Sequence, residues 1–204
     1  MKEKLLKGLK WFYKSYIWLG LALLIIDIVT KQIILSFNAA EGALISDWGF
    51  VRIRFILNRG AAFGIGTGDA LTNRILYLVI ASLVSIGIGG YLIVKRKETK
   101  LFMRAALIMV VTGAIGNMID RIFYGPEYSV VDWIDFYWVP GWVWVFNIAD
   151  CCIVIAAFMM IIYIIVTEVK DVIKRRNAEI AEENAKKTDS QDDKESENTD
   201  LENK

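Results

Sequence analysis

The chain contains no histidine among its 204 residues. This absence excludes the serine–histidine–aspartate triad, the cysteine–histidine dyad and every zinc site that uses histidine ligands. The two cysteines are adjacent, at Cys151 and Cys152, so the chain can form neither a disulfide framework nor a four-thiolate metal site. Acid–base chemistry must therefore depend on carboxylates, lysines, tyrosines or cysteines.

Long hydrophobic runs are abundant instead. Hydrophobic residues make up 55% of the chain and charged residues 23%, and the mean hydropathy is +0.42, which is too apolar for an ordinary soluble domain. A membrane-spanning helix needs about 20 residues, and four stretches qualify, so the sequence predicts an all-α membrane protein with a bundle of four transmembrane helices. The predicted spans lie at about residues 17–37, 75–94, 101–119 and 142–166.

Basic residues are distributed unevenly around these spans. Five lysines lie in residues 1–16, four basic residues lie in 95–100, and four more lie in 167–176. The longer connections, at 38–74 and 120–141, hold few basic residues for their length. The positive-inside rule therefore places both termini in the cytoplasm and the two longer connections on the outer side of the membrane.

The C-terminal part of the chain differs in composition from the rest. Residues 177–204 hold ten acidic residues and four lysines, and almost nothing apolar follows Ile180. Such a segment cannot bury enough surface to offset its ordering entropy, so we expect residues 167–204 to form a largely disordered, acidic cytoplasmic tail. The chain thus divides into a basic N-terminal segment at 1–16, a four-span domain at 17–166 and this tail.

The first outer connection contains a strand pattern followed by glycines. Residues 50–58 alternate apolar and basic side chains over their middle, which is typical of a half-exposed strand. The string RGAAFGIGTGD comes next and could be a phosphate cradle. No P-loop lysine follows it, however, so tight turns are the better interpretation of its glycines. These glycines are Gly60, Gly64, Gly66 and Gly68.

The second outer connection is rich in aromatic residues. Seven aromatic side chains fall within residues 133–146, including four of the seven tryptophans in the chain. Aromatic rings favour the headgroup level of a bilayer, so we expect this segment to lie along the outer membrane interface.

Several ionisable residues lie inside or beside the predicted spans. Each costs at least about 2.5–3.5 kcal/mol at the centre of a helix unless it has a partner or a function. Asp27 and Lys31 are four residues apart on one helical face, which indicates a neutralising pair. A functional alternative is that Lys31 also reaches an anionic lipid or the acids of a site. Asp120 and Arg121 are neighbours at the end of the third span and could form a local or cross-helix ion pair.

Two further carboxylates favour a catalytic interpretation. Asp132 is embedded among apolar and aromatic residues, and Asp150 follows Trp142 by eight residues, or about 12 Å along a helix. Two carboxylates that meet near the outer boundary cannot both ionise easily, so they would share one proton. One could then activate water while the other polarises a carbonyl, which is amide hydrolysis without histidine. Asn147, three residues before Asp150 on the same helix face, is placed to donate a hydrogen bond to its carboxylate.

A proton- or ion-coupled carrier is the alternative function, with a relay made of Asp27, Lys31, Asp120 and Asp150. Such a carrier should show ionisable residues on both sides of the midplane and a discontinuous helix or an inverted repeat, and the sequence shows neither. A membrane scaffold, the third class, has no need of buried carboxylates. Cys151 is not expected to be a nucleophile, because the chain has no histidine to activate it.

Five short motifs occur in order along the chain. They are Asp27 to Lys31, NRGAAFG at 58–64, GNMIDR at 116–121, VVDWID at 130–135 and FNIAD at 146–150. On these motifs, residues 17–166 resemble the bacterial lipoprotein signal peptidases (signal peptidase II). The resemblance implies four transmembrane helices with a small extracytoplasmic (periplasmic) β-cradle, in agreement with the strand pattern in the first outer connection.

The resemblance also implies an aspartic endopeptidase of the bacterial cytoplasmic (inner) membrane, with its active site near the outer face. It would remove signal peptides from diacylglyceryl-modified prolipoproteins by cutting just before the lipidated cysteine, with Asp132 and Asp150 as the catalytic dyad. Such an enzyme needs no metal or organic cofactor, binds globomycin-type inhibitors and membrane lipid but no nucleic acid, and is expected to be a monomer. The matching positions that would orient the dyad or hold the substrate are Asp27, Lys31, Asn58, Gly60, Asn117, Asp120, Arg121 and Asn147.

Overall fold

The computed structural model describes residues 2–60, 69–95, 97–124, 129–140 and 144–202. The chain forms two compact units, Met1–Met160 and Ile161–Lys204. All of the predicted site residues lie in the described part of the first unit.

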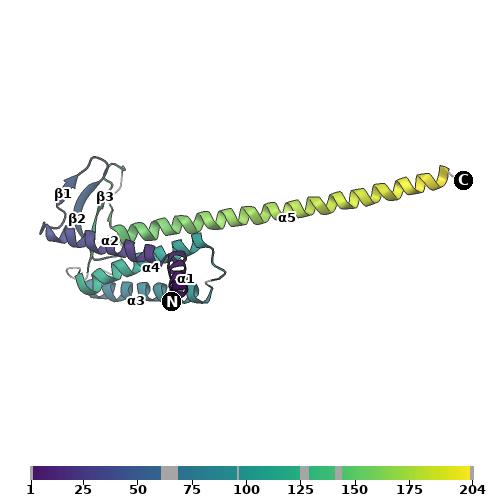
Figure 1. The fold of residues 1–204 in the computed structure, drawn as a ribbon. Coiled ribbons are helices and arrows are strands. Elements are labelled where there is room, and N and C mark those ends of the chain that lie inside the picture. Colours follow the sequence, from purple (N-terminus) through teal and green to yellow (C-terminus); the bar gives the residue numbers. More distant parts are fainter. Residues whose placement is uncertain (1, 61–68, 96, 125–128, 141–143, 203–204) are drawn as a thin grey trace. The chain divides into compact units, whose positions relative to one another are not determined.

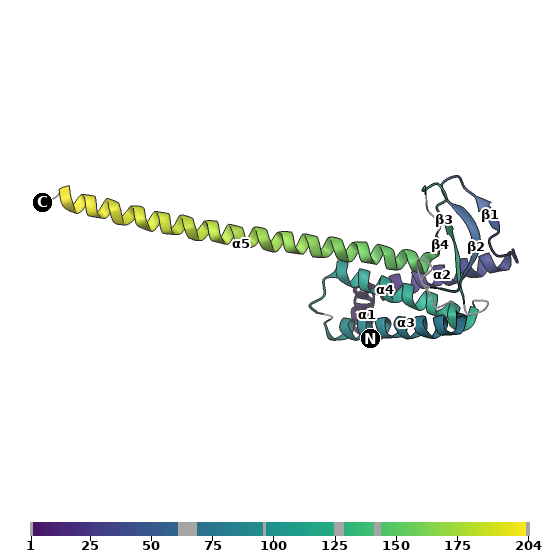
Figure 2. The same cartoon turned by 180° about the vertical axis from the view of Figure 1, so that it is seen from behind.

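The first unit contains a bundle of apolar helices preceded by a short basic helix. Its helices are α1 at Lys2–Ser15, α2 at Ile17–Ser36, α3 at Ala70–Val94, α4 at Leu101–Ile119 and the beginning of α5, which starts at Ile148. A π-helical turn at Asp120–Tyr124 extends α4. α4 packs against both α2 and α3, and the three helices lie side by side in Figures 1 and 2.

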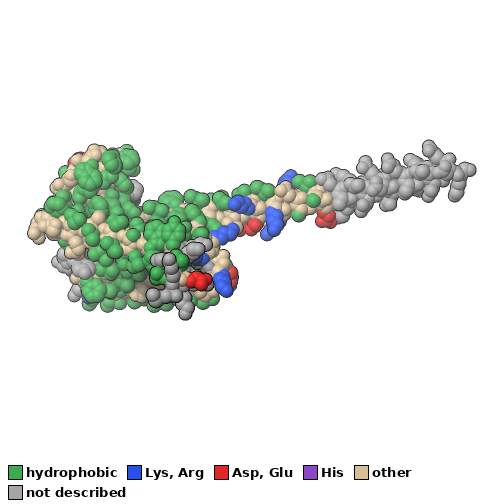
Figure 3. Space-filling model, in the orientation of Figure 1, with side chains coloured by type: hydrophobic (Ala, Val, Ile, Leu, Met, Phe, Trp, Pro, Cys, Tyr) green, Lys and Arg blue, Asp and Glu red, His purple; other side chains and the backbone are tan. Residues whose placement is uncertain are grey.

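Four helices in the described part of the chain are long and apolar enough to cross a membrane, which confirms the predicted number of spans. Hydrophobic side chains cover most of the face of the bundle that is seen in Figure 3. The candidate spans are Ile17–Ser36, Leu71–Val94, Leu101–Phe123 and Ile148–Glu182.

The predicted start of the fourth span at residue 142 was wrong. The described residues directly before α5, 144–147, are not helical, because Val145–Phe146 pairs with a strand of the sheet. Asp150 therefore lies in the first turn of α5 rather than two turns inside a helix. The second span begins earlier than predicted, since α3 starts at Ala70, where the side chain of Asp69 accepts a hydrogen bond from the backbone N–H of Thr72 at 2.7 Å.

The two longer connections form a small antiparallel sheet, in agreement with the β-cradle that the family resemblance implied. Its strands pair in the order β1 at Leu44–Asp47, β2 at Arg52–Asn58, β3 at Val130–Asp135 and β4 at Val145–Phe146. β2 lies within the residues 50–58 that were predicted as a strand. In the β2–β3 pair, Ile56 is opposite Asp132 and Asn58 is opposite Val130.

Two buried clusters hold the sheet and the start of α5 against the bundle. Val131 of β3 and Phe55 of β2 pack with Ile34 of α2. The second cluster joins α4 to α5 and consists of Ala106, Met109, Cys152 and Ala156. Because α2 also packs against α4, these contacts bring β3 and the beginning of α5 toward the same part of the bundle.

The second unit consists of the remainder of α5, which is helical as far as Glu202. Here the structure differs from the expectation of a largely disordered tail at residues 167–204. Glutamate, lysine and alanine are frequent in this segment and have high intrinsic helix propensity. Local preference therefore favours a helix even where few apolar residues are present.

Candidate active site

Asp132 lies on β3 with its side chain only 1% exposed. Its Oδ2 accepts a hydrogen bond from Nδ2 of Asn58 at 2.9 Å, and its Oδ1 accepts one from Nδ2 of Asn147 at 2.6 Å. Asn58 is a diagonal neighbour of Asp132 across the β2–β3 pair, which places the two side chains on one face of the sheet. Both oxygens of this carboxylate thus have an amide donor.

Asp150 forms a reciprocal cap with Asn147 at the beginning of α5. The backbone N–H of Asp150 donates to Oδ1 of Asn147 at 2.9 Å, and the backbone N–H of Asn147 donates to Oδ2 of Asp150 at 3.3 Å. This capping-box arrangement satisfies two backbone donors that the helix itself leaves unpaired. Oδ1 of Asp150 also accepts a hydrogen bond from Nδ2 of Asn117 on α4, at 2.8 Å.

The side chain of Asn147 connects the two acids. Its amide nitrogen donates to Asp132 and, at 3.1 Å, to Oδ1 of Asn117, while its oxygen caps Asp150. We expected Asn147 to donate to the carboxylate of Asp150, and its backbone N–H does so, whereas its side chain holds the other acid. The structure therefore brings Asp132 and Asp150 to the same site.

Lys31 is buried among three acceptors next to this site. Its Nζ lies 2.8 Å from Oδ2 of Asp27, 3.0 Å from Oδ2 of Asp120 and 3.2 Å from Oδ1 of Asn117. The predicted Asp27–Lys31 pair is confirmed, and Lys31 also reaches the site through Asn117. Among the described residues, Asp120 pairs with Lys31 rather than with its neighbour Arg121, because its side chain faces α2 and accepts the Val131 N–H at 3.1 Å.

Arg121 binds the backbone just after the end of β2. Its Nη2 donates to the carbonyl oxygen of Gly60 at 2.7 Å, and its Nη1 donates to that of Asn117 at 3.2 Å. The N–H of Gly60 in turn donates to Oδ1 of Asn58 at 3.0 Å. The guanidinium also lies over the ring of Tyr77 on α3, 4.8 Å from its centroid. Sequence reasoning missed Tyr77, because no local pattern distinguishes it from the other residues of α3.

Burial shapes the acid–base properties of Asp132. Burial, together with the neighbouring carboxylate of Asp150, raises the pKa of Asp132 from 3.8 to about 8, although the hydrogen bonds from Asn58 and Asn147 oppose the shift. The carboxyl group of Asp132 can therefore hold a proton near neutral pH. A carboxylic acid beside a carboxylate supplies a proton donor and a proton acceptor in one place.

In the described part of the chain, no three Cys, Asp or Glu side chains are arranged to hold a metal ion. Residues 61–68, with Gly64, Gly66, Gly68 and the end of the NRGAAFG motif, lie outside the described residues. In the aromatic segment, Tyr137 lies under the guanidinium of Arg52 at 3.5 Å and donates to the Gly49 carbonyl at 2.8 Å.

Comparisons with known proteins identify the family of the chain. The family model described as signal peptidase (SPase) II matches residues 19–166. The chain is 32% identical to the lipoprotein signal peptidase of Symbiobacterium thermophilum over 153 residues, which cover 74% of this chain and 95% of that protein. It is 34% identical to the lipoprotein signal peptidase of Burkholderia mallei over 151 residues, which cover 71% of this chain and 84% of that protein.

Two solved structures of a bacterial membrane enzyme, both obtained by the in meso method, resemble the fold. The first, at 2.3 Å resolution, gives a TM-score of 0.63 at 29% identity and covers 74% of this chain and 87% of that chain. The second, at 1.9 Å resolution, gives a TM-score of 0.62 at 29% identity and covers 74% of this chain and 92% of that chain. Because the family model matches well over half of its residues, the chain belongs to the signal peptidase II family.

Proposed function

We propose that this chain is an intramembrane aspartic endopeptidase that removes signal peptides from diacylglyceryl-modified prolipoproteins, with Asp132 and Asp150 as its catalytic dyad. The observation that carries the proposal is the side chain of Asn147, which donates to Asp132 and caps Asp150 where the sheet meets α5. Membership of the signal peptidase II family supports the same reaction. The cut falls just before the lipidated cysteine of the substrate.

The reaction needs one proton acceptor and one proton donor. The ionised carboxylate of the pair takes a proton from water while the water oxygen attacks the carbonyl carbon of the scissile peptide bond. The protonated partner donates a hydrogen bond to the carbonyl oxygen and stabilises the charge of the tetrahedral intermediate. When the C–N bond breaks, the nitrogen receives a proton from the pair and leaves as an amine. The dyad is then left with one shared proton, as at the start.

The surrounding amides hold the two carboxylates in position. Lys31 donates to Oδ1 of Asn117, so the Nδ2 of this amide is directed to Asp150. Accurate positioning matters because a misplacement of about 1 Å can lower a catalytic rate by about 10²-fold. We therefore assign Asn117, Asn147 and Lys31 the role of orienting the dyad.

We infer that the sheet and the dyad lie at the outer face of the bacterial cytoplasmic membrane, and that both termini lie in the cytoplasm. The distribution of basic residues supports this orientation. Because α5 begins at Ile148, Asp150 lies roughly 3 Å along its axis, close to the membrane boundary. A substrate whose acyl chains lie in the bilayer and whose mature part lies in water presents its scissile bond at the same depth.

A proton- or ion-coupled carrier, the alternative function, gains no support from the site. Asp27, Lys31 and Asp120 form one buried cluster beside the two acids of the dyad. A carrier would need ionisable groups arranged along the spans, on both sides of the midplane. The cluster instead lies beside the dyad and connects to Asp150 through the amide of Asn117.

The test is a processing assay with a purified diacylglyceryl-modified prolipoprotein in detergent or membranes. Asp132→Asn and Asp150→Asn keep the size of each side chain and remove its titratable proton, and each should slow cleavage by about 10²–10⁴-fold. The control is Asp47→Asn on β1, an exposed acid of the same sheet that pairs with Arg52. It should cleave like the intact protein, and a globomycin-type cyclic peptide should inhibit both.

The outcomes separate the reaction from the assigned residues. Cleavage by both Asn variants at the rate of the intact protein would show that the dyad is wrong. Failure of the intact protein to shorten a verified substrate would show that the reaction itself is wrong.

A further inference from the structure

The helix before the first span, α1, has the composition of a membrane-surface helix. It precedes residue 19, where the match to the family model begins. Five of its fourteen residues are lysine and one is glutamate. At 100° per residue, its positions divide into a largely apolar side and a largely basic side. The apolar side holds Leu5, Leu6, Leu9, Phe12 and Tyr13 together with Lys2, and Trp11 is the one aromatic residue on the basic side. The opposite side holds Lys4, Lys7, Lys10 and Lys14.

A turn at Tyr16, stabilised by hydrogen bonds, separates α1 from α2. Tyr16 has a φ of 59°, in the left-handed region that residues with a side chain rarely adopt. The hydroxyl of Ser15 accepts a hydrogen bond from the N–H of Ile17 at 3.2 Å. The indole N–H of Trp18 donates to the carbonyl of Tyr13 at 3.0 Å, and the two rings stack. α1 therefore leaves the direction of α2, and Figures 1 and 2 show it crossing the bundle at an angle.

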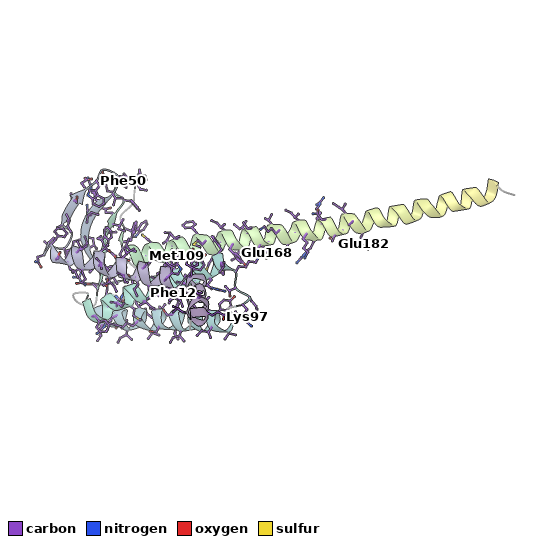
Figure 4. The ribbon with its side chains drawn as sticks, in the orientation of Figure 1. Phe12, Phe50, Lys97, Met109, Glu168 and Glu182 are labelled. Carbon is purple, nitrogen blue, oxygen red and sulfur yellow. The ribbon has the colours of Figure 1, made fainter. Side chains whose placement is uncertain are left out.

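α1 contacts α2 and α4 but leaves apolar side chains uncovered. Leu5 is 65% exposed and Leu6 is 51% exposed. Figure 4 places Phe12 of α1 and Lys97 of the α3–α4 connection toward one end of the bundle, and Phe50 of the β1–β2 turn toward the other. α1 thus lies at the end of the bundle where the first span begins, which is the end away from the sheet.

We propose that α1 lies in the plane of the membrane surface and binds anionic phospholipids. Its apolar side enters the boundary of the acyl chains, and its lysines bind the phosphate groups. A lipid surface suits both sides of the helix at once, because hydrocarbon and anionic headgroups lie next to each other there. The proposal depends on the membrane insertion of α2 but not on the assignment of the catalytic dyad.

The test uses the full-length protein in nanodiscs that contain phosphatidylcholine and phosphatidylglycerol. Electron paramagnetic resonance of spin-labelled lipids measures the association of each lipid with the protein surface. The variant replaces Lys4, Lys7, Lys10 and Lys14 with glutamine, which keeps the helix propensity and removes the charge. A lysine near an anionic surface contributes roughly fivefold to affinity, so the intact protein should prefer phosphatidylglycerol several-fold, and the variant less than about twofold. High salt should reduce the preference of the intact protein in the same way.

A matched control removes the same number of charges elsewhere. It replaces Lys186, Lys187, Lys194 and Lys204 with glutamine and should keep the lipid preference of the intact protein. An unchanged preference in the α1 variant would overturn the proposal. Absence of any preference in the intact protein would also overturn it and would favour an acidic protein as the partner of the lysines.

A depth measurement tests the apolar side separately. A spin label at Leu6→Cys, in a background with Cys151 and Cys152 replaced by alanine, should collide more often with oxygen than with a water-soluble nickel complex. The opposite order would show that this side faces water and would overturn the placement of α1.

Discussion

The carboxylate of Asp27 on α2 caps the first turn of α5, because its Oδ1 accepts a hydrogen bond from the backbone N–H of Ala149 at 2.9 Å. The first N–H groups of a helix have no partner inside the helix, and a negative charge beside them is stabilising. The other oxygen of Asp27 lies 2.8 Å from Nζ of Lys31. A single side chain thus joins the buried ion cluster to the helix that carries Asp150.

Gly116 on α4 leaves the space that this contact needs. A Cβ at this position would lie 2.7 Å from Oδ2 of Asp27 and 3.0 Å from Cβ of Ala149. Gly116→Ala should therefore displace either the Asp27 carboxylate or the first turn of α5. We expect kcat for prolipoprotein processing to fall by at least about tenfold with a smaller change in KM, because the loss is one of positioning rather than of uniform binding.

Gly89→Ala on α3 is the matched control, since nothing lies within 4 Å of a Cβ at Gly89. It should leave kcat and KM unchanged and should not lower the thermal unfolding midpoint, because alanine favours a helix more than glycine does. If Gly116→Ala folds and has the kcat of the intact protein, the contact between Asp27 and α5 does not position Asp150.

Local sequence patterns predict the spans and the near neighbours in this protein, but not the distant partners. The four spans follow from hydropathy, and the Asp27–Lys31 pair follows from the spacing of four residues along a helix. The nearest cation to Asp120 in the sequence is Arg121, yet its partner in the structure is Lys31 from another helix. Spacing cannot reveal such a partner, because the packing of α2 against α4 decides it.

The beginning of α5 shows a second limit of sequence reasoning. Val145 and Phe146 are apolar enough for a helix or a strand, and pairing of β4 with β3 decides for the strand. Asn147 could be recognised as a residue near Asp150, but its bond to Asp132 depends on that same pairing of strands. The sequence thus singles out polar residues that lie close together in the structure, and tertiary contacts determine which of them touch.

The pH dependence of processing should be bell-shaped, because the dyad works only while it holds one proton. At low pH both acids are protonated and no base remains. Above the pKa of Asp132, which burial and the Asp150 carboxylate raise to about 8, the pair loses its proton and no acid remains. We expect kcat/KM, measured from about pH 5 to pH 10 at constant ionic strength, to fall as the pH rises through about 8. A rate that stays level up to about pH 10 would contradict a shared proton.

The titration of Asp132 should also make the stability of the folded protein depend on pH. Its pKa is raised from 3.8 to about 8 in the folded protein, so the folded state keeps a proton that the unfolded chain releases at lower pH. The contribution of Asp132 to stability is therefore complete below about pH 4 and is lost as the pH rises through about 8. The thermal unfolding midpoint of the intact protein should fall across this window more steeply than that of Asp132→Asn. Equal slopes for the two proteins would show that Asp132 titrates normally.

Removing one member of the buried ion cluster should destabilise the protein more than removing all of its charges. Lys31→Met leaves the carboxylates of Asp27 and Asp120 buried without their cation, and breaking a buried pair in this way costs about 3–5 kcal/mol. The triple variant Asp27→Asn, Lys31→Met and Asp120→Asn carries no buried charge at this position. Its thermal unfolding midpoint in detergent should be higher than that of Lys31→Met.

The control for this series is Lys95→Met, because Lys95 pairs with Glu98 on an exposed turn and such pairs contribute less than about 1 kcal/mol. Its unfolding midpoint should match that of the intact protein.

The single and triple cluster variants should both process substrate slowly, since Asn117 loses the donor that directs its amide to Asp150. A Lys31→Met protein as stable as the triple variant would mean that the two carboxylates find other partners or bind protons when the lysine is gone. Normal processing by the triple variant would show that the dyad keeps its geometry without Lys31.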